Sequence, residues 1–260
     1  MNLNPTENEL LKNDPPYLLE VRGISKDFSP EQHSGLLYEQ VESAFFKKTV
    51  QKIKGKKVPI LADISFRVRP GEIVAIVGKN GTGKTTLFRI LTGTLLATQG
   101  EIIRHCPLVP VLETGVGVHS ELDGFANFLL EGTARGWKLK DLKLRAAEIL
   151  EYSGLEKELH KPLKYFSAGM VGRLSLSLAL FREKALFLMD EVFGAGDQEF
   201  REKNEVTLQR KAAQGCAFLV VSHNAEFIKR VCNRVLYLKE GSIVFDGGVE
   251  EGLRIYHGKK

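Results

Sequence analysis

The sequence has few of the residues that characterise secreted, metal-binding or membrane-spanning proteins. Its 260 residues include only three cysteines, Cys106, Cys216 and Cys232, which are scattered along the chain. An odd number of dispersed cysteines argues against a disulfide framework or a cysteine metal site, and indicates buried thiols in a reducing compartment. No uncharged apolar run has bilayer-spanning length, and no basic start is followed by an apolar segment. We therefore expect neither a membrane-spanning helix nor a secretory signal.

The overall charge and composition exclude no further class of protein. The formal net charge of +5 permits an acidic membrane surface or a nucleic acid as a neighbour without indicating either. With 43% hydrophobic and 27% charged residues, the chain resembles ordinary globular proteins in composition. Its length is that of one large domain or two small ones. The function therefore has to be inferred from motifs.

The strongest motif runs from Gly78 to Thr86 and fits the phosphate-binding pattern G-x-x-x-x-G-K-[ST] at every fixed position. Residues 72–77 before it form an apolar, β-branched run that predicts a buried strand. Residues 86–91 after it predict a helix that ends near Gly93. A glycine-rich turn without a ligand is the alternative, and the strand, the Lys-Thr pair and the helix argue against it.

The spacing of this motif has a chemical reason. Glycines let the backbone approach a ligand closely, so successive N–H groups and the helix N-terminus surround an anion. We expect Lys84 to reach the outer phosphates of a nucleotide and the Thr85 hydroxyl to bind Mg²⁺. The other predicted phosphate-binding residues of the loop are Gly78, Lys79, Asn80, Gly81, Thr82, Gly83 and Thr86.

Two more apolar runs end in polar residues. The run 185–189 leads into Asp190 and Glu191, and the run 216–221 leads to His223. Asp190 is placed to hold Mg²⁺, and Glu191 to activate a water molecule as general base. His223 is placed to hydrogen-bond a γ-phosphate. The alternatives are an ordinary helix N-cap for the acids and a structural role for the histidine. Because ligands bind beyond the carboxyl ends of parallel strands, we expect these residues and the phosphate loop to form one site.

The remaining pattern alternates strands with helices, which predicts an α/β fold with a mainly parallel sheet. Further strands are predicted at residues 17–24, 60–68, 101–104, 108–112, 235–238 and 243–245, the last two as a hairpin. Further helices are predicted at residues 125–131, 139–152, 168–181, 200–214, 227–232 and 252–256.

Two segments do not fit this alternation. Residues 1–16 are polar and aperiodic, which predicts a disordered leader. Residues 29–59 combine a helical apolar face with a lysine-rich stretch and predict an inserted helix and basic loop. Two interpretations of this insertion remain open. It packs on its own domain as a solvated amphipathic helix, or it contacts a partner near anionic lipid headgroups.

With these motifs the chain resembles the ATP-binding subunit of ABC transporters. Residues 165–170, Y-F-S-A-G-M, resemble the family signature LSGGQ, with Ser167 and Gly169 matching and Ala168 in place of a glycine. The resemblance implies that Ser167 and Gly169 contact the γ-phosphate. It also implies a P-loop NTPase fold over residues 17–260, with an antiparallel β portion and a helical subdomain at about 113–180.

Four other residues take roles from the same resemblance. Asp197 matches the aspartate of the D-loop, His223 the switch histidine, and Phe28 the aromatic residue that stacks on adenine. Residues 194–196 depart from the usual D-loop sequence. The usual metal-contacting glutamine is missing, and Glu113 lies nearest its position, so Glu113 is the candidate metal ligand there.

Two stretches narrow the resemblance to the polysaccharide-exporting subfamily. Residues 112–124 are similar to its L-E-x-G-x-G-F-x-x-E-L-x-G stretch, and residues 190–197 to its D-E-V-x-x-x-G-D. The resemblance implies an ATPase that uses ATP and Mg²⁺ to drive export of a lipid-linked polysaccharide, such as O-antigen, capsule or teichoic acid. Its implied partners are a second copy in an ATP-sandwich homodimer and a separate membrane permease, at the cytoplasmic face of the plasma membrane.

Two alternatives to polysaccharide export remain. The chain exports another substrate, which would change only the membrane subunit. Alternatively, it is a soluble ABC-type ATPase acting on nucleic acid or ribosomes, which the lysine-rich stretch within 29–59 keeps open. Relatives of that second kind usually carry two cassettes or a coiled-coil insertion, and this chain shows neither, so no nucleic acid partner is expected.

Overall fold

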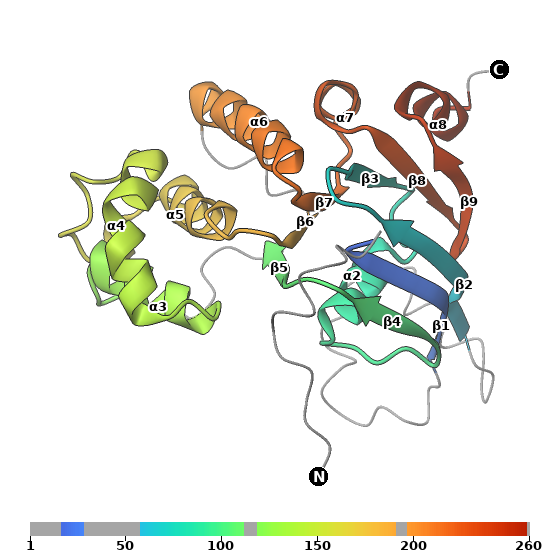
Figure 1. Ribbon diagram of the computed structural model, residues 1–260, viewed down its shortest axis with the longest axis horizontal. Coiled ribbons are helices and arrows are strands. Elements are labelled where there is room, and N and C mark those ends of the chain that lie inside the picture. Colours follow the sequence, from blue (N-terminus) through green and yellow to red (C-terminus); the bar gives the residue numbers. More distant parts are fainter. Residues whose placement is uncertain (1–16, 29–57, 112–118, 191–196, 259–260) are drawn as a thin grey trace, which may run out of the picture.

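The computed structural model of the chain describes residues 17–28, 58–111, 119–190 and 197–258 (Figure 1). The predicted leader at residues 1–16 and nearly all of the predicted insertion at residues 29–59 lie outside these residues. Among the described residues, no helix has the length and apolar character that a membrane span requires.

A six-stranded sheet forms the centre of the molecule. Its strand order is β5-β6-β7-β3-β8-β9, and every neighbouring pair is parallel except β8 and β9, which form an antiparallel hairpin. The strands β3 and β7 are buried at every position, as expected for a parallel sheet covered on both faces. The strand bounds are β3 Ile73–Val77, β5 Leu108–Val111, β6 Leu186–Asp190, β7 Ala217–Val221, β8 Arg234–Lys239 and β9 Ser242–Gly247.

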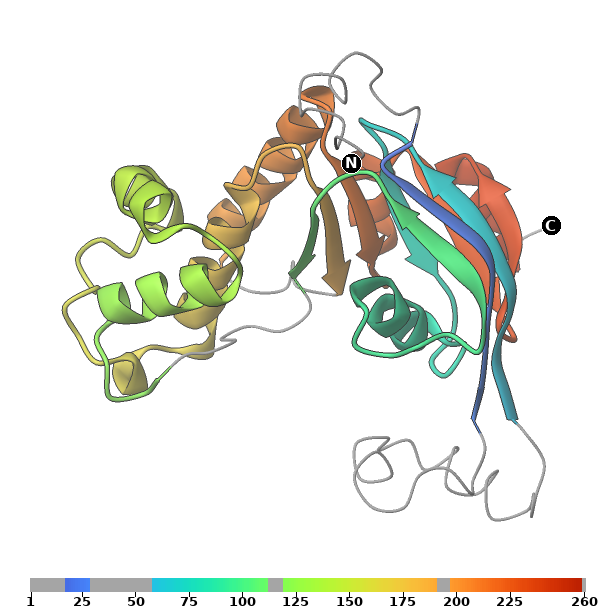
Figure 2. The same cartoon turned by 60° about the horizontal axis from the view of Figure 1, so that its bottom comes forward.

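A second, antiparallel sheet covers one face of the first. It has the order β2-β1-β4, with bounds β1 Leu19–Phe28, β2 Val58–Val68 and β4 Gln99–Arg104. The helix α2, Lys84–Thr92, lies between the two sheets (Figure 2). Its buried side chains join apolar residues of both sheets in one cluster, so the helix that follows the phosphate loop is held from two sides.

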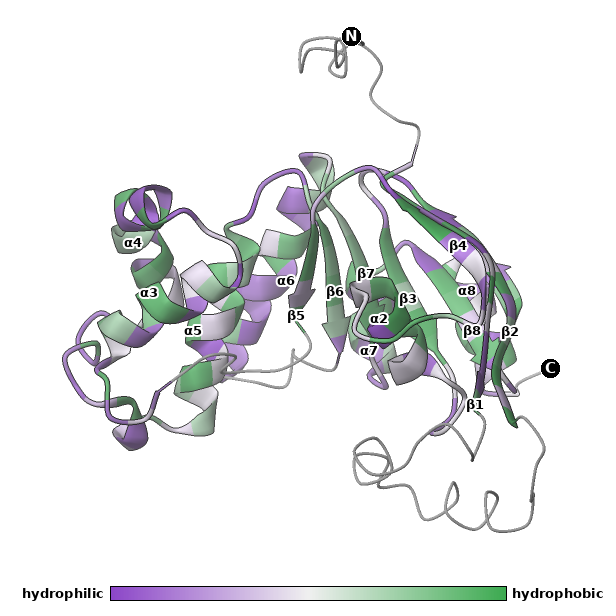
Figure 3. Ribbon diagram, turned by 90° about the horizontal axis from the view of Figure 1, so that it is seen from below, coloured by the Kyte–Doolittle hydropathy of each residue, from purple (hydrophilic) through white to green (hydrophobic). Residues whose placement is uncertain are grey.

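The other helices form two groups. The helices α6 Gln198–Ala213, α7 Ala225–Val231 and α8 Val249–Tyr256 cover the opposite face of the central sheet. The helices α3 Gly124–Ala134, α4 Leu139–Ser153 and α5 Ala168–Leu180 enclose a separate apolar cluster, and we call them the helical group. Figure 3 shows the hydrophobic colouring of the central strands β6, β7 and β3.

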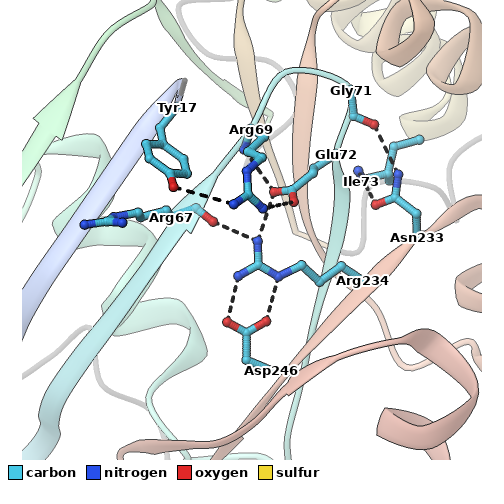
Figure 4. A network of polar contacts seen from close by, with 9 residues as sticks. All are labelled: Tyr17, Arg67, Arg69, Gly71, Glu72, Ile73, Asn233, Arg234 and Asp246. Carbon is cyan, nitrogen blue, oxygen red and sulfur yellow. Dashed lines mark hydrogen bonds and ion pairs between the residues drawn. The ribbon is translucent and has the colours of Figure 1, made fainter. Parts of the chain in front are cut away.

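A polar network fixes the start of the strand that leads into the phosphate loop (Figure 4). Arg234 of β8 donates to both carboxylate oxygens of Asp246 in β9, at 2.6 and 2.7 Å. The same guanidinium donates to Glu72 at 3.0 Å and to the carbonyl of Arg67 at 2.8 Å. Glu72 immediately precedes β3, so this network ties β2, β3, β8 and β9 together at one point.

The predicted fold class is confirmed, and most predicted elements are present with shifts of a few residues at their ends. Gly154 ends α4 with φ at 67°, as predicted for a left-handed C-cap. The predicted end of the strand at residues 17–24 was wrong, because β1 continues to Phe28. Gly23 has φ at 60° and the pairing register shifts between Val21 and Ile24, so the alternation that marks a strand breaks there although the strand continues.

The prediction of buried thiols is confirmed for two of the three cysteines. Cys216 and Cys232 are buried, and burial raises the pKa of Cys232 to about 12. Cys106 is only half-buried, and its thiol donates to the carbonyl of Leu18 at 3.9 Å. The prediction of a buried thiol was therefore wrong for Cys106, because this residue lies just after the edge strand β4.

Candidate functional site

The phosphate loop connects β3 to α2, as its sequence predicts. Gly83 caps α2 with φ at 102°, and no side chain caps the first turn, so the amide groups of this helix end point toward a ligand position. A Cβ atom at Gly78 would lie 2.4 Å from the carbonyl oxygen of Leu238. Glycine is therefore required at Gly78 by close packing and favoured at Gly83 by backbone conformation.

Lys84 lies inside the curl of this loop. It is 8% exposed, and its ammonium donates to the carbonyl of Gly78 at 2.6 Å and to that of Lys79 at 3.0 Å. The Thr82 hydroxyl donates to the same Lys79 carbonyl at 2.9 Å. These bonds hold the charge of Lys84 at the centre of the loop.

The other residues of the loop present an open rim. Lys79, Asn80, Gly81 and Thr85 are exposed, and Thr86 is half-buried at the first turn of α2. The Thr85 hydroxyl is therefore accessible to a ligand that occupies the loop. A hydroxyl oxygen is a suitable Mg²⁺ ligand, and it accompanies a lysine that suits phosphate.

Three neighbouring strands end at this loop. In the parallel sheet, β7 lies between β6 and β3. Val221 of β7 pairs with Asp190 of β6 on one side and with Ile76 of β3 on the other. Asp190 therefore ends β6 at the same level as the residues that precede the phosphate loop. His223, two residues after β7, is exposed at this edge and lines a cavity of about 1170 Å³ between α6 and α7. The structure thus brings Asp190, His223 and the loop to one edge of the sheet.

Two predicted site residues lie outside the described residues. They are Glu191, the predicted general base, and Glu113, the candidate metal ligand. Within the described ranges, no group of three or more His, Cys, Asp or Glu side chains forms a metal site by protein ligands alone. The oxygen donors available there are the Thr85 hydroxyl and the Asp190 carboxylate, which fits a metal held largely by a nucleotide's phosphates.

The predicted signature residues lie at the start of α5. Ser167 is exposed and is the N-cap of this helix, with its hydroxyl accepting from the Met170 amide at 3.2 Å. Gly169 is half-buried in the first turn. Helix α5 lies on the other side of strands β5 and β6 from α2 (Figures 1 and 2). The signature residues and the phosphate loop of one chain are therefore on separate sides of these strands.

Asp197 connects α5, the helix that begins at the signature residues, to α6, which packs on the central sheet. It is exposed and is the N-cap of α6, accepting from the Phe200 amide at 3.0 Å. Its carboxylate also pairs with Arg173 of α5. The bond from the Phe200 amide, followed by that from Arg173, holds the pKa of Asp197 below its ordinary value. The sequence analysis missed Arg173, although it lies six residues after Ser167 on the predicted helix.

Phe28 is the last residue of β1 and is half-buried. It pairs with Val58 of β2, and the ammonium of Lys26 lies 5.1 Å from the centre of its ring. The same part of β2 contacts the phosphate loop, since a Cβ atom at Gly83 would lie 2.6 Å from Cδ2 of Leu61. This end of β1 is therefore held beside the loop through β2.

Comparison with known proteins agrees with this geometry. The sequence profile described as "ABC transporter" matches residues 61–194. The chain is 33% identical over 241 residues to the O-antigen export system ATP-binding protein RfbB of Klebsiella pneumoniae, covering 92% of this chain and 97% of that protein. It is 31% identical over 208 residues to the teichoic acids export ATP-binding protein TagH of Staphylococcus epidermidis, covering 80% and 78%.

Solved structures show the same fold. An ATP-binding subunit of an ABC transporter superimposes with a TM-score of 0.71 at 23% identity, over 93% of both chains. The dimeric post-hydrolysis state of an ATP-binding cassette bound to ADP and Pi gives 0.67 at 18% identity, over 89% of this chain and 98% of that one. With the family match over residues 61–194 and 33% identity to RfbB, the chain belongs to the ABC transporter family, as one of its ATP-binding subunits.

Proposed function

We propose that this chain is the ATP-hydrolysing subunit that powers export of a lipid-linked polysaccharide across the cytoplasmic membrane through a separate permease. The observation that carries the proposal is the similarity to RfbB, which extends over 92% of this chain and 97% of that O-antigen export protein. Similarity to a teichoic acids export protein adds a second relative whose name describes export.

The phosphate loop binds the nucleotide in this proposal. Lys84, at the centre of the loop, exchanges its carbonyl partners for the outer phosphates of ATP, and the amides from residues 78 to 86 surround the same phosphates. Thr85 and Asp190 hold Mg²⁺, whose charge offsets that of the phosphates. Phe28, held beside the loop through β2, stacks on the adenine ring.

Hydrolysis requires a base and a group that positions the phosphate. Glu191, the residue after Asp190, takes a proton from the attacking water. His223, at the end of the neighbouring strand, hydrogen-bonds the γ-phosphate. Lys84 stabilises the negative charge on the transferring group.

The active unit is a head-to-tail homodimer. Ser167 and Gly169 are at the start of α5, which lies on the other side of β5 and β6 from α2, and Asp197 pairs with Arg173 of the same helix α5. An exposed helix N-terminus at Ser167 suits the γ-phosphate of ATP held by a second copy. Each ATP then lies between Lys84 of one copy and Ser167 of the other. In this arrangement the helical group is a subdomain of a single ATPase domain spanning residues 17–260.

The permease contacts the helical group at the cytoplasmic face of the membrane. Leu122, two residues before α3, is 41% exposed, and Phe125 and Leu130 on α3 are 39% and 40% exposed. Together they present apolar side chains that suit a helix of a membrane subunit. This places the chain as a peripheral subunit of a membrane complex.

The proposal is tested by purifying the tagged full chain from gently solubilised membranes and identifying its partners. We expect a multi-spanning permease in stoichiometric amount. Disrupting the gene should remove the surface polysaccharide, and the wild-type chain, but not Lys84→Ala, should restore it. Recovery with nucleic acid or ribosomes and without a permease would overturn the export function. A permease with an unchanged surface polysaccharide would indicate another exported substrate.

A further inference from the structure

A second cavity lies at the end of the central sheet opposite to the phosphate loop. It has a volume of about 480 Å³ and is lined by residues of α4, α6 and the connections that enter β6 and β7. In its wall, Lys184 lies two residues before β6 and Cys216 lies one residue before β7. Because the strands are parallel to β3, the phosphate loop follows their other ends, so this cavity is separate from the nucleotide site.

The charged side chains around this cavity are mainly basic. Its wall contains Arg145, Lys184, Arg210 and Lys211, against the carboxylates of Glu148 and Glu183. Both carboxylates pair with one residue, since the guanidinium of Arg145 lies 3.0 Å from Glu183 and 3.5 Å from Glu148. Within the part of the chain that the structure describes, Lys184, Arg210 and Lys211 have no carboxylate in ion-pair contact.

Lys211 is the most deeply placed of these cations. It is 9% exposed, and its ammonium donates to the carbonyl of Arg182 at 2.8 Å. Burial lowers the pKa of Lys211, and the nearby charges of Arg145 and Arg210 lower it further, against the opposing effect of Cys216 and Glu183. An ammonium group has three donors, so a buried one beside like charges is stabilised by an anion that accepts the remaining bonds.

Lys184 contributes a second unusual feature at the rim. Its φ is 46°, in the left-handed region that residues with a side chain rarely adopt. Such a backbone is strained relative to glycine, and strained positions cluster at ligand-binding sites. A lysine at this position therefore adds charge to the cavity where a glycine would fit the backbone better.

We propose that this cavity binds a phosphate group, either free or as the monoester of a small organic molecule. Its wall has two more cations than carboxylates, which matches a dianion. The planar guanidinium of Arg210 suits two phosphate oxygens. The lining also includes Leu180, Phe181 and the Thr207 hydroxyl, which suit the organic part of an ester.

Such a ligand would connect two parts of the chain. Arg145 belongs to α4 of the helical group, while Arg210 and Lys211 belong to α6 on the central sheet. A phosphate shared by both helices would hold the helical group against the sheet. The site therefore gives the chain a means of sensing a phosphorylated compound that is independent of ATP.

The test uses amide chemical shifts of the full chain titrated with inorganic phosphate at constant ionic strength. We expect saturable shifts at residues 182–185 and 210–216, which differ from any shifts in the phosphate loop. The variant Lys184→Asn removes the charge and introduces asparagine, which tolerates the left-handed backbone. Lys184→Asn and Arg210→Gln should each weaken phosphate binding about tenfold. The matched control Lys229→Gln, at an exposed position on α7, should bind like the wild type. Thermal unfolding of each variant checks its fold.

Parallel titrations identify the source of the phosphate. Tighter binding of glycerol 3-phosphate than of inorganic phosphate would assign the site to an ester, and equal binding would assign it to the phosphate group alone. Shifts confined to residues 78–86, equal shifts with sodium chloride, or an equally tight response to acetate would overturn the proposal. So would wild-type affinity in both folded cavity variants.

Discussion

Arg135 donates two hydrogen bonds to one carboxylate oxygen of Glu131, from Nε at 3.0 Å and from a terminal nitrogen at 2.8 Å. The same oxygen accepts from the Ser175 hydroxyl at 2.6 Å, and the other terminal nitrogen of Arg135 donates to the Pro110 carbonyl at 2.8 Å. The Glu131 side chain is only 1% exposed. This pair therefore joins α3 and α5 of the helical group to strand β5 of the central sheet.

We predict that Arg135→Ala strongly destabilises the chain. The substitution leaves the buried carboxylate of Glu131 without its cation, which typically costs about 3–5 kcal/mol in the free energy of unfolding. Urea denaturation measures the effect. The control is Arg254→Ala, which removes an exposed pair to Glu251 at 4.0 Å and should change stability by less than about 1 kcal/mol. Similar losses in both variants would show that Arg135 has no special role.

Lys84→Ala should reduce ATP turnover by on the order of a hundredfold or more, because it removes a preorganised charge from the transferring phosphoryl group. Phosphate release by the purified chain measures the turnover. Lys229→Ala, at an exposed lysine of α7, is the matched control and should retain the wild-type rate. An Lys84→Ala variant that is folded and still turns over at the wild-type rate would refute the proposed nucleotide site.

Glu191→Gln should bind ATP, hydrolyse it slowly and elute as a dimer from a sizing column. The amide keeps the shape of the carboxylate but cannot accept the proton from water. Adding Ser167→Arg should return the protein to the monomer, since a bulky side chain at this exposed N-cap blocks the proposed composite site. If Glu191→Gln stays monomeric with saturating ATP, the composite site is wrong.

Asp197 should contribute to stability only while its carboxylate is charged. The Phe200 amide and Arg173 lower the pKa of Asp197 in the folded state. Its contribution is therefore present above the ordinary aspartate pKa of about 4 and is lost as the pH falls through the lower folded value. Asp197→Asn keeps the N-cap but not the charge, so its unfolding midpoint should fall less on acidification than that of the wild type. An equal fall in the unfolding midpoints of Asp197→Asn and the wild type would contradict this role of the Asp197 charge.

The three thiols should differ in their rates of alkylation. Burial raises the pKa of both thiols, but Cys106 is only half-buried, whereas Cys232 is buried and has its pKa raised to about 12. Since the thiolate is the reactive form, iodoacetamide at mildly alkaline pH should modify Cys106 first in the folded chain. Peptide mass spectrometry gives the order, and denatured protein, in which all three react, is the control. Faster labelling of Cys232 than of Cys106 in folded protein would contradict the structure.

The strand ends that form the candidate site were predictable from local patterns. Apolar runs that stop at Asp190 and before His223 mark buried parallel strands, and the phosphate loop has a fixed spacing. The sequence alone could not supply the strand order, which depends on pairing between distant segments. β6 and β7, for example, are separated in the chain by the whole of α6 and pair only in space.

Buried polar contacts were the other part that the sequence could not supply. Glu131 on α3 and Arg135 at its C-cap are four residues apart, a spacing typical of exposed pairs. Only the packing of α3 against α5 and β5 shows that the pair is buried. The ion pair of Arg173 with Asp197 likewise joins two helices whose contact no local pattern reveals.

The ladder of β6, β7 and β3 also determines where the chain can change in length. Deleting one residue within β6 would draw Asp190 back by about 3.3 Å and turn its side chain to the other face of the sheet. The connection between α4 and α5 lies outside this ladder, so a change of length there leaves the three strand ends level. Among variants of this chain that remain functional, insertions and deletions should therefore occur mainly around the helical group and rarely in the central strands.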